Sequence, residues 1–494
     1  MRRIYSLLLV ALIIPAGLFA RQKDASTKYA KTITEADMKA KLTVLASDEF
    51  GGRETGTEGQ KKASAFLEDF YKDLGLFAPV DGTYRQKFSM YQSDWSEVYV
   101  KAGKNKLFNG KDIVFRGNAN MTSEQTFDVV YVGNTSTLEG MNLTGKVVIS
   151  TARDRSSQKL LFDMGARAIL EARENEEQFK QGMPRFARML GLSRLRFNET
   201  PENDEERMLF YMTVSNAADI LNTTREKLLA AQESPTDIKA GTVNIFAKRK
   251  IKTIDTENMM AFLEGTDKKD EVLVISSHYD HIGTNADGAI NNGADDDGSG
   301  TTGVMEIAEA FVQAAKEGHR PRRSILFLNV TGEEKGLLGS AYYADHPIYP
   351  LDKTINNLNI DMIGRVDPEH ENDREYIYVI GSEKLSSHLK VISEFANITY
   401  TNLKLDYKFD DPNDTNRIYY RSDHYNFAKN GIPIIFYFNG THADYHRPTD
   451  TIDKIEFDVM AKRAKLVFHT AWILANREAR TPVDRTDDMT YNRD

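Results

Sequence analysis

The pattern of hydrophobic and polar positions changes its character along the chain. Residues 33–50 and 57–76 carry apolar side chains at helical spacing, which predicts two amphipathic helices. The glycine-rich segment 51–59 lies between them, and Thr57 is suited to cap the second helix. The N-terminal part of the chain is therefore expected to be a helical pair joined by a tight loop.

The pattern then becomes that of short strands and turns. Residues 127–133 and 145–150 are apolar runs typical of strands, and residues 160–172 predict a short helix. The strongly charged segment 173–207 fits no regular pattern. We therefore predict a separate β-rich unit, inserted at residues 95–248.

Beyond this insertion, apolar strands alternate with helices, which is typical of a parallel sheet covered on both faces. The predicted strands lie at 271–276, 324–330, 357–360 and 432–438. The predicted helices lie at 299–316, 337–343, 384–396 and 458–477. We expect an α/β fold with a mostly parallel central sheet flanked by helices, formed by residues 21–94 and 249–480. Residues 481–494 are predicted to be a polar tail.

Composition limits the chemistry of the chain. Its 494 residues exceed what one hydrophobic core usually serves, which agrees with a main domain and an insertion. The formal net charge is −9 and no long basic tract occurs, so nucleic acid is not an expected partner. Cysteine is absent, which excludes disulfides, thiolate-bound zinc and cysteine nucleophiles. Any metal must therefore be held by His, Asp and Glu.

Residues 1–20 have the pattern of a secretory signal. Arg2 and Arg3 precede an apolar run over residues 5–14, and a small residue, Ala20, ends the segment. An uncleaved membrane anchor is the alternative, but the apolar run is short for a bilayer. We expect cleavage near Ala20 and an exported acidic protein, periplasmic or secreted, with no stable membrane partner.

Residues that can bind cations follow each predicted strand of the main domain. In chain order they are His278-Tyr-Asp-His281, Gly332-Glu-Glu334, Asp361 and His442-Ala-Asp-Tyr-His446, with the acidic segment 291–300 before the helix at 299. Each of these alone is more typical of a helix cap or a solvated charge. The carboxyl ends of parallel strands meet at one edge of a sheet, however, and five such segments at one edge predict a metal site.

The local spacings suggest a division of roles. His278 and Asp280 are two apart on an extended segment and so point to the same side, where a carboxylate can fix the tautomer of a ligating imidazole. Glu333 and Glu334 are adjacent, so their side chains diverge. One of them is expected to bind metal and the other to face the attacking water.

These motifs resemble those of a known family. They are His278-Tyr-Asp, Gly293-Ala-Asp-Asp-Asp-Gly-Ser-Gly300, Gly332-Glu-Glu-Lys-Gly-Leu-Leu-Gly-Ser340, Asn359-Ile-Asp-Met-Ile-Gly364, Arg421-Ser-Asp-His424 and Tyr445-His446. In this order they resemble the motifs of the two-zinc exopeptidases of metallopeptidase family twenty-eight, which include secreted bacterial leucyl aminopeptidases and glutamate carboxypeptidase. The resemblance covers about residues 30–90 and 250–480.

The resemblance implies a set of metal ligands. His278 and Asp361 would hold one Zn²⁺, Glu334 and His446 would hold a second, and Asp296 would bridge the two. The choice of Asp296 over its two neighbours rests on the motif match alone. Mn²⁺ or Co²⁺ could occupy the same ligands.

The resemblance also implies catalytic roles. Glu333 would be the general base, Tyr445 would donate a hydrogen bond to the developing oxyanion, and Asp280 would orient His278. The inserted unit is similar to a protease-associated domain through its segments 129–133, 145–149 and 165–170.

The expected function is hydrolysis of N-terminal residues from peptide substrates by an exported aminopeptidase. A carboxypeptidase or dipeptidase is the alternative, because Arg421 could receive an α-carboxylate while the acidic loop 410–414 could receive an α-ammonium. Glutaminyl cyclisation is less favoured, since those relatives work with one zinc. A non-catalytic binding protein is also less favoured, because the implied ligands and base are all present.

Overall fold

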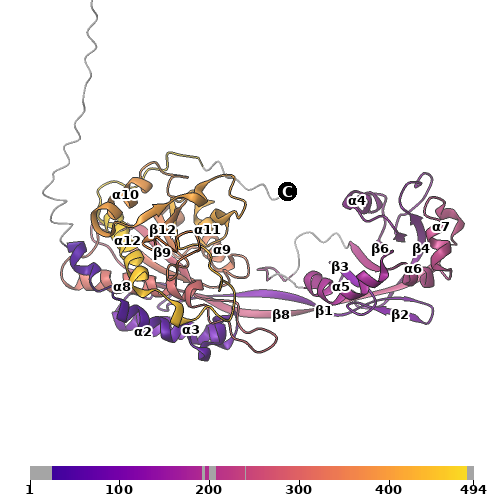
Figure 1. Ribbon diagram of the computed structural model, residues 1–494, viewed down its shortest axis with the longest axis horizontal. Coiled ribbons are helices and arrows are strands. Elements are labelled where there is room, and N and C mark those ends of the chain that lie inside the picture. The colour runs from indigo at the N-terminus through magenta and orange to yellow at the C-terminus, as the bar shows by residue number, and fades with distance from the viewer. Residues whose placement is uncertain (1–24, 192–194, 200–206, 240, 487–494) are drawn as a thin grey trace, which may run out of the picture. The chain divides into compact units, whose positions relative to one another are not determined.

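The chain forms two compact units in a computed structural model, which describes residues 25–191, 195–199, 207–239 and 241–486. One unit contains the residues up to Phe88 and those from Asp255, and the other is Ser89–Ile254. The chain leaves the first unit within strand β1 (Arg85–Ala102) and returns within β8 (Gly241–Leu263) (Figure 1). The sequence placed these boundaries at 95 and 248. Both crossings run through long strands, so no turn residue marks either boundary.

The signal segment predicted at residues 1–20 and the end of the predicted tail, residues 487–494, lie outside the described residues. Among the described residues, no helix has both the length and the apolar character needed to cross a bilayer.

The first unit has a mixed sheet with a parallel centre, in the strand order β13-β12-β14-β11-β9-β10-β8. Its strands are β9 (Lys268–His278), β10 (Arg323–Val330), β11 (Thr354–Ile360), β12 (Tyr376–Ile380), β13 (Lys404–Asp406) and β14 (Ile434–Phe438). The neighbours β14, β11, β9 and β10 pair in parallel, whereas β8 and β12 pair antiparallel with β10 and β14. The predicted α/β fold with a mostly parallel central sheet is confirmed.

Helices cover both faces of this sheet. They are α2 (Glu35–Leu45), α3 (Glu58–Leu74), α8 (Gly300–Lys316), α9 (Leu338–Asp345), α10 (Leu389–Ala396), α11 (His424–Ala428) and α12 (Phe457–Asn476). Leu273 and Ile275 of β9 share a core with α2, α3, α8 and α12, while the alternate residues Val272 and Val274 share a second core with α9 and α11. Since both faces are buried, polar groups gather at the carboxyl edge of the strands.

The loop between the first two helices makes a close contact with the main chain beyond β9. Thr57 caps α3 as predicted, because its side chain accepts a hydrogen bond from the backbone of Gln60. Before it, residues Asp48–Arg53 form a 3₁₀ turn in which Gly52 has a φ of 72°. A Cβ atom on Gly52 would lie 2.4 Å from the carbonyl oxygen of Asn291, so only glycine permits this approach.

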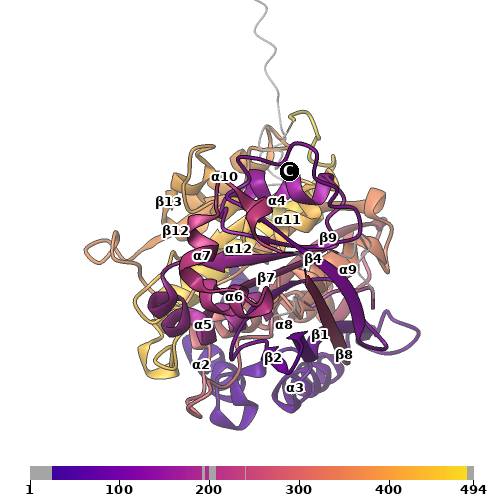
Figure 2. The ribbon, with the colours of Figure 1, turned by 90° about the vertical axis from the view of Figure 1, so that its right-hand side faces the viewer.

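The second unit contains a sheet in the order β8-β4-β5-β6-β7-β3, in which β4, β5, β6 and β7 are parallel. Its other strands are β2 (Asn105–Phe108), β3 (Val114–Gly117), β4 (Gln125–Gly133), β5 (Val147–Ser150), β6 (Ala168–Arg173) and β7 (Met208–Thr213). Its helices are α4 (Arg155–Asp163), α5 (Glu176–Gly191), α6 (Val214–Ile220) and α7 (Arg225–Ala230). Helices α6 and α7 pack on one face, and α4 and α5 on the other. Figure 2 labels the helices of this unit.

Two sequence expectations for this unit need correction. The helix predicted over 160–172 is wrong beyond Asp163, because the chain turns at Gly165 and then enters the buried strand β6. Pairing of β6 with β5 and β7 decides that conformation, and a short apolar run does not reveal it. Part of the charged segment 173–207, which had no predicted structure, is helix α5. The resemblance to a protease-associated domain stays a prediction.

Candidate metal centre

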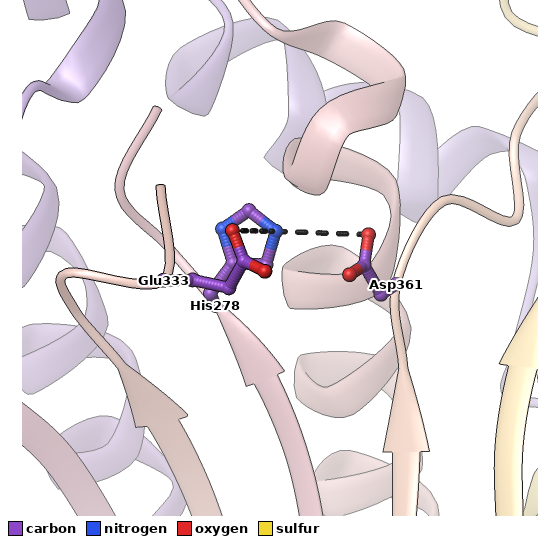
Figure 3. Close-up of side chains that lie close together, drawn as sticks. All are labelled: His278, Glu333 and Asp361. Carbon is purple, nitrogen blue, oxygen red and sulfur yellow. Dashed lines mark ion pairs between the residues drawn. The ribbon is translucent and has the colours of Figure 1, made fainter. Parts of the chain in front are cut away.

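Four strand ends of the first unit carry the candidate residues to one edge of the sheet. His278 is the last residue of β9, Glu333 follows β10, Asp361 follows β11, and the loop with His446 follows β14. The register pairs His278 directly with Val330 at the end of β10. Figure 3 shows the side chains of His278, Glu333 and Asp361 turned toward one another.

The donor atoms fall into two groups. In the first, Nε2 of His278 lies 3.6 Å from Oδ1 of Asp361 and 4.0 Å from Oε2 of Glu333 (Figure 3). In the second, Nδ1 of His281 lies 2.7 Å from Oε1 of Glu334 and 3.8 Å from Oδ2 of Asp296. The donor atoms of each group lie within 4.8 Å of one another. The adjacent residues Glu333 and Glu334 therefore serve different groups, as their divergence indicated.

Asp296 joins the two groups. Its Oδ1 lies 3.3 Å from Nε2 of His278, and its Oδ2 lies 3.0 Å from Nε2 of His446. The same His446 nitrogen is 3.1 Å from Oε2 of Glu334. The structure thus brings His278, Asp296, Glu334, Asp361 and His446 into one cluster.

The two neighbours of Asp296 are occupied elsewhere. Asp297 accepts hydrogen bonds from the backbone N–H groups of three residues, His278, Gly300 and Met362. Asp295 accepts from the backbone N–H of Gly364 and the hydroxyl of Ser299. Of the three consecutive carboxylates, Asp296 alone faces both donor groups, so the geometry agrees with the choice that rested on the motif.

Asp280 approaches His278 with both its backbone carbonyl and its carboxylate. Nδ1 of His278 lies 3.0 Å from the backbone carbonyl oxygen of Asp280 and 3.7 Å from its carboxylate. The carbonyl therefore accepts a hydrogen bond from the Nδ1–H group, which leaves Nε2 free to bind a cation. The carboxylate instead accepts hydrogen bonds from the hydroxyl of Thr55 and the backbone N–H of Glu333. It thereby helps to position the segment after β10, and orientation of His278 by this carboxylate stays a prediction.

Tyr445 and His446 lie on the loop that follows β14. His446 has a φ of 55°, a costly conformation for a residue other than glycine, and this conformation accompanies its approach to Asp296 and Glu334. The phenol ring of Tyr445 stacks on His446 with centroids 3.9 Å apart. Nη2 of Arg421 donates a hydrogen bond of 3.3 Å to the Tyr445 hydroxyl oxygen.

A pocket opens over the first donor group. Tyr445 and Arg421 form part of its wall together with His278, Asp296, Glu333 and Asp361. The remaining wall includes four apolar side chains, Met362, Ile418, Phe436 and Phe438. A molecule held against the donor atoms would therefore meet both a polar and an apolar surface.

The buried carboxylates of the cluster favour a positive charge between them. Burial raises the pKa of Glu333 well above its usual value, and it raises the pKa of Asp423 to about 7. Burial lowers the pKa of His446, but its interactions with the nearby carboxylates of Asp296 and Glu334 outweigh this and raise the pKa to about 10. Without a cation, the cluster thus holds a proton on His446 to offset its carboxylates.

Buried polar atoms without hydrogen-bond partners at the centre indicate whether its residues fit a metal. Five buried polar atoms of these residues make no hydrogen bond within the part of the chain that the structure describes: Nε2 of His278, both ring nitrogens of His281, Oδ2 of Asp296 and Oε1 of Glu334. Buried polar atoms without partners are costly. Mixed imidazole and carboxylate donors are typical ligands of zinc, so the residues fit a metal centre.

Sequence reasoning missed two residues of this region. Arg53 is 1% exposed and donates to the backbone carbonyls of four residues, Leu45, Tyr279, Asn292 and Gly293. It ties the segment after His278 to the segment before Asp296, and a lone arginine in a glycine-rich loop gives no signal of this. His281 belongs to a segment that the sequence marks as able to bind cations, but the motif resemblance assigned it no role.

Comparisons with known proteins find similarity to peptidases. Residues 258–471 match the family model described as "Peptidase family M28". The chain is 29% identical to a probable zinc metalloprotease of Pyricularia oryzae over 49% of its length and 54% of that protein. It is 30% identical to a probable leucine aminopeptidase of Arthroderma otae over 42% of its length and 55% of that protein. The chain thus spans about half the length of these curated relatives.

The fold also resembles that of a solved structure. An aminopeptidase from Aneurinibacillus sp. strain AM-1 aligns over 94% of this chain and 98% of its own, with a TM-score of 0.53 and 19% identity. At that identity the likeness concerns the fold.

Proposed function

Because residues 258–471 match the model of peptidase family M28, we propose that this protein is a zinc-dependent aminopeptidase that removes N-terminal residues from peptides. One observation carries the proposal: Asp296 presents one carboxylate oxygen to His278 and the other to His446. A carboxylate shared in this way is suited to two cations held side by side. The names of the relatives, zinc metalloprotease and leucine aminopeptidase, support the metal and the reaction.

The proposed centre has two Zn²⁺ ions. His278 and Asp361 would hold one ion, Glu334 and His446 the other, and Asp296 would bind both. Two divalent cations, when bound, lower the pKa of a water molecule and polarise a carbonyl group. The unpaired buried donors of His278, Asp296 and Glu334 support this assignment.

Glu333 is the proposed general base. It belongs to the donor group of His278 and Asp361 and lines the pocket, so it can meet a water molecule and a substrate there. In the proposed reaction its carboxylate takes a proton from the attacking water and passes it to the leaving amine. Burial raises the pKa of Glu333, which favours its holding that proton between the two steps.

Tyr445 is the proposed donor to the substrate carbonyl oxygen. Arg421 donates to the phenolic oxygen, so the phenolic hydrogen stays available for another acceptor. A hydrogen bond that strengthens as negative charge develops on the carbonyl oxygen lowers the barrier to hydrolysis.

Substrates with either end blocked test the proposal. The zinc-loaded protein is expected to hydrolyse aminoacyl amides and dipeptides with a free amino terminus. N-acetylation should abolish cleavage, and amidation of the carboxyl terminus should not. The reverse pattern would identify a carboxypeptidase that uses Arg421 for the α-carboxylate. No cleavage of any substrate at full zinc loading would reject a peptidase.

We further propose that the protein is exported after removal of residues 1–20, to the periplasm or the medium. The basic start and apolar run of this segment support the proposal. Amino-terminal sequencing of the mature protein is expected to begin near Arg21. A cell-retained protein that still begins at Met1 would contradict it.

A further inference from the structure

We infer that His281 is a third imidazole ligand of the metal centre and binds the second cation together with Asp296, Glu334 and His446. The inference builds on the proposed two-zinc site but adds a ligand that the motif resemblance does not assign. His281 is fully buried and lies three residues after His278, where the chain leaves β9. Its ring faces the carboxylates of the second group rather than those of the first.

The contact between His281 and Glu334 differs from a hydrogen bond. Nδ1 and Oε1 are 2.7 Å apart, yet within the described residues neither atom has a hydrogen-bond partner. The N–H direction therefore does not point at the oxygen. The two atoms lie close together but do not point at each other, as two ligands of one ion do. A cation between them would give both atoms a partner.

The spacing of the surrounding donors suits a single ion. Zinc binds nitrogen and oxygen at about 2.0–2.2 Å, so tetrahedral donors lie roughly 3.3–3.6 Å apart. Oδ2 of Asp296 is 3.8 Å from Nδ1 of His281 and 3.0 Å from Nε2 of His446. Oε2 of Glu334 is 3.1 Å from the same His446 nitrogen. These separations bracket the tetrahedral value.

The extra imidazole makes the two cations unequal. The second cation has four protein ligands, His281, His446, Glu334 and Asp296, which is the closed set of a structural zinc site. The first has three, His278, Asp361 and Asp296, which is the open set of a catalytic site. Glu333 lies in the donor group of the first cation. The second cation is therefore expected to bind more tightly, and the reacting water to belong to the first.

X-ray absorption spectroscopy of the full-length protein with one equivalent of zinc tests this directly. Multiple scattering from imidazole is expected to show two histidines per zinc, His281 and His446. One histidine per zinc would overturn the inference, because each site without His281 contains a single imidazole. The measurement needs no variant and no activity, so two histidines in a protein that cleaves no peptide would leave this inference standing while the proposed function failed.

A pair of variants tests the same point by affinity. His281→Gln is expected to weaken the tighter zinc site by more than 100-fold, measured by competition with a chelator of known affinity. An imidazole that only orients a ligand typically changes affinity 10–100-fold. His442→Gln is the matched control, because His442 is a buried imidazole at the same edge that pairs with Asp295. A change below 100-fold in His281→Gln, or an equal loss in the control, would refute the ligand role.

Discussion

Adjacent glutamates with separate roles give the sharpest test of the proposed mechanism. Glu333→Gln removes a proton acceptor but keeps the shape of the side chain. Glu333 lies in the donor group of His278 and Asp361 but is not a proposed ligand, so both zinc ions should remain bound. Loss of a positioned base typically costs about 10²–10⁴-fold in rate. At about 1.36 kcal/mol per factor of ten, the barrier should rise by about 3–5 kcal/mol.

The folding stability of the Glu333→Gln variant should not fall, although its activity does. Burial raises the pKa of Glu333, which means that the folded protein disfavours a negative charge at this position. A neutral glutamine removes this cost at neutral pH. The metal-free variant is therefore expected to unfold at a temperature no lower than that of the metal-free wild type.

Glu334→Gln is the matched comparison one residue away. Glu334 contacts His446 at 3.1 Å and His281 at 2.7 Å, so the change should reduce bound zinc rather than spare it. The assay pairs kcat/KM on an aminoacyl amide with zinc content by mass spectrometry. The separate roles of Glu333 and Glu334 are refuted if Glu333→Gln loses zinc, if it turns over at the wild-type rate, or if both variants keep two zinc ions.

Three further changes have defined outcomes. Asp296→Ala should empty both metal positions together, and two bound ions in the variant would make a neighbouring aspartate the bridge. Arg53→Met removes four hydrogen bonds from a charged donor, each worth about 1.5–3 kcal/mol before relaxation. The variant should therefore unfold at a temperature well below that of the wild type, and its zinc affinity should fall. A wild-type unfolding temperature and zinc affinity would contradict the positioning role of Arg53. Burial raises the pKa of Glu306 from 4.5 to about 7, so the folded state keeps a proton that the unfolded state loses, and stability should fall as pH rises from about 4.5 to 7. The free energy of unfolding of Glu306→Gln, measured with urea, should therefore rise by up to about 3 kcal/mol relative to wild type between pH 4.5 and pH 8. Glu309→Gln is the control, because it alters a more exposed partner of the same Lys41. A difference in unfolding free energy between Glu306→Gln and wild type that does not change with pH would refute the raised pKa.

The pattern of neighbouring residues along the chain was sufficient to predict the architecture of the first unit. Continuous apolar runs such as 324–330 predict buried strands because a sheet covered on both faces requires apolar side chains on both. The carboxyl ends of parallel strands share one edge, so the sequence also indicated that His278, Glu333 and Asp361 would converge. These conclusions depend on periodicity and strand direction, both of which are local properties.

Tertiary structure alone decided features that depend on contacts between distant segments. The strand β6 was mistaken for helix because its pairing with β5 and β7 overrides the local preference. The hydrogen bond of His278 Nδ1 with the backbone carbonyl of Asp280, which lies nearer than the carboxylate of the same residue, was not predictable from the spacing. Arg53 and His281 could not be assigned from spacing, since their partners come from other loops and only folding brings those loops within hydrogen-bonding or coordination distance. The sequence pattern predicts which side chains lie at the carboxyl edge of the sheet. The direction in which each donor atom points is set by the packing of the whole unit around it.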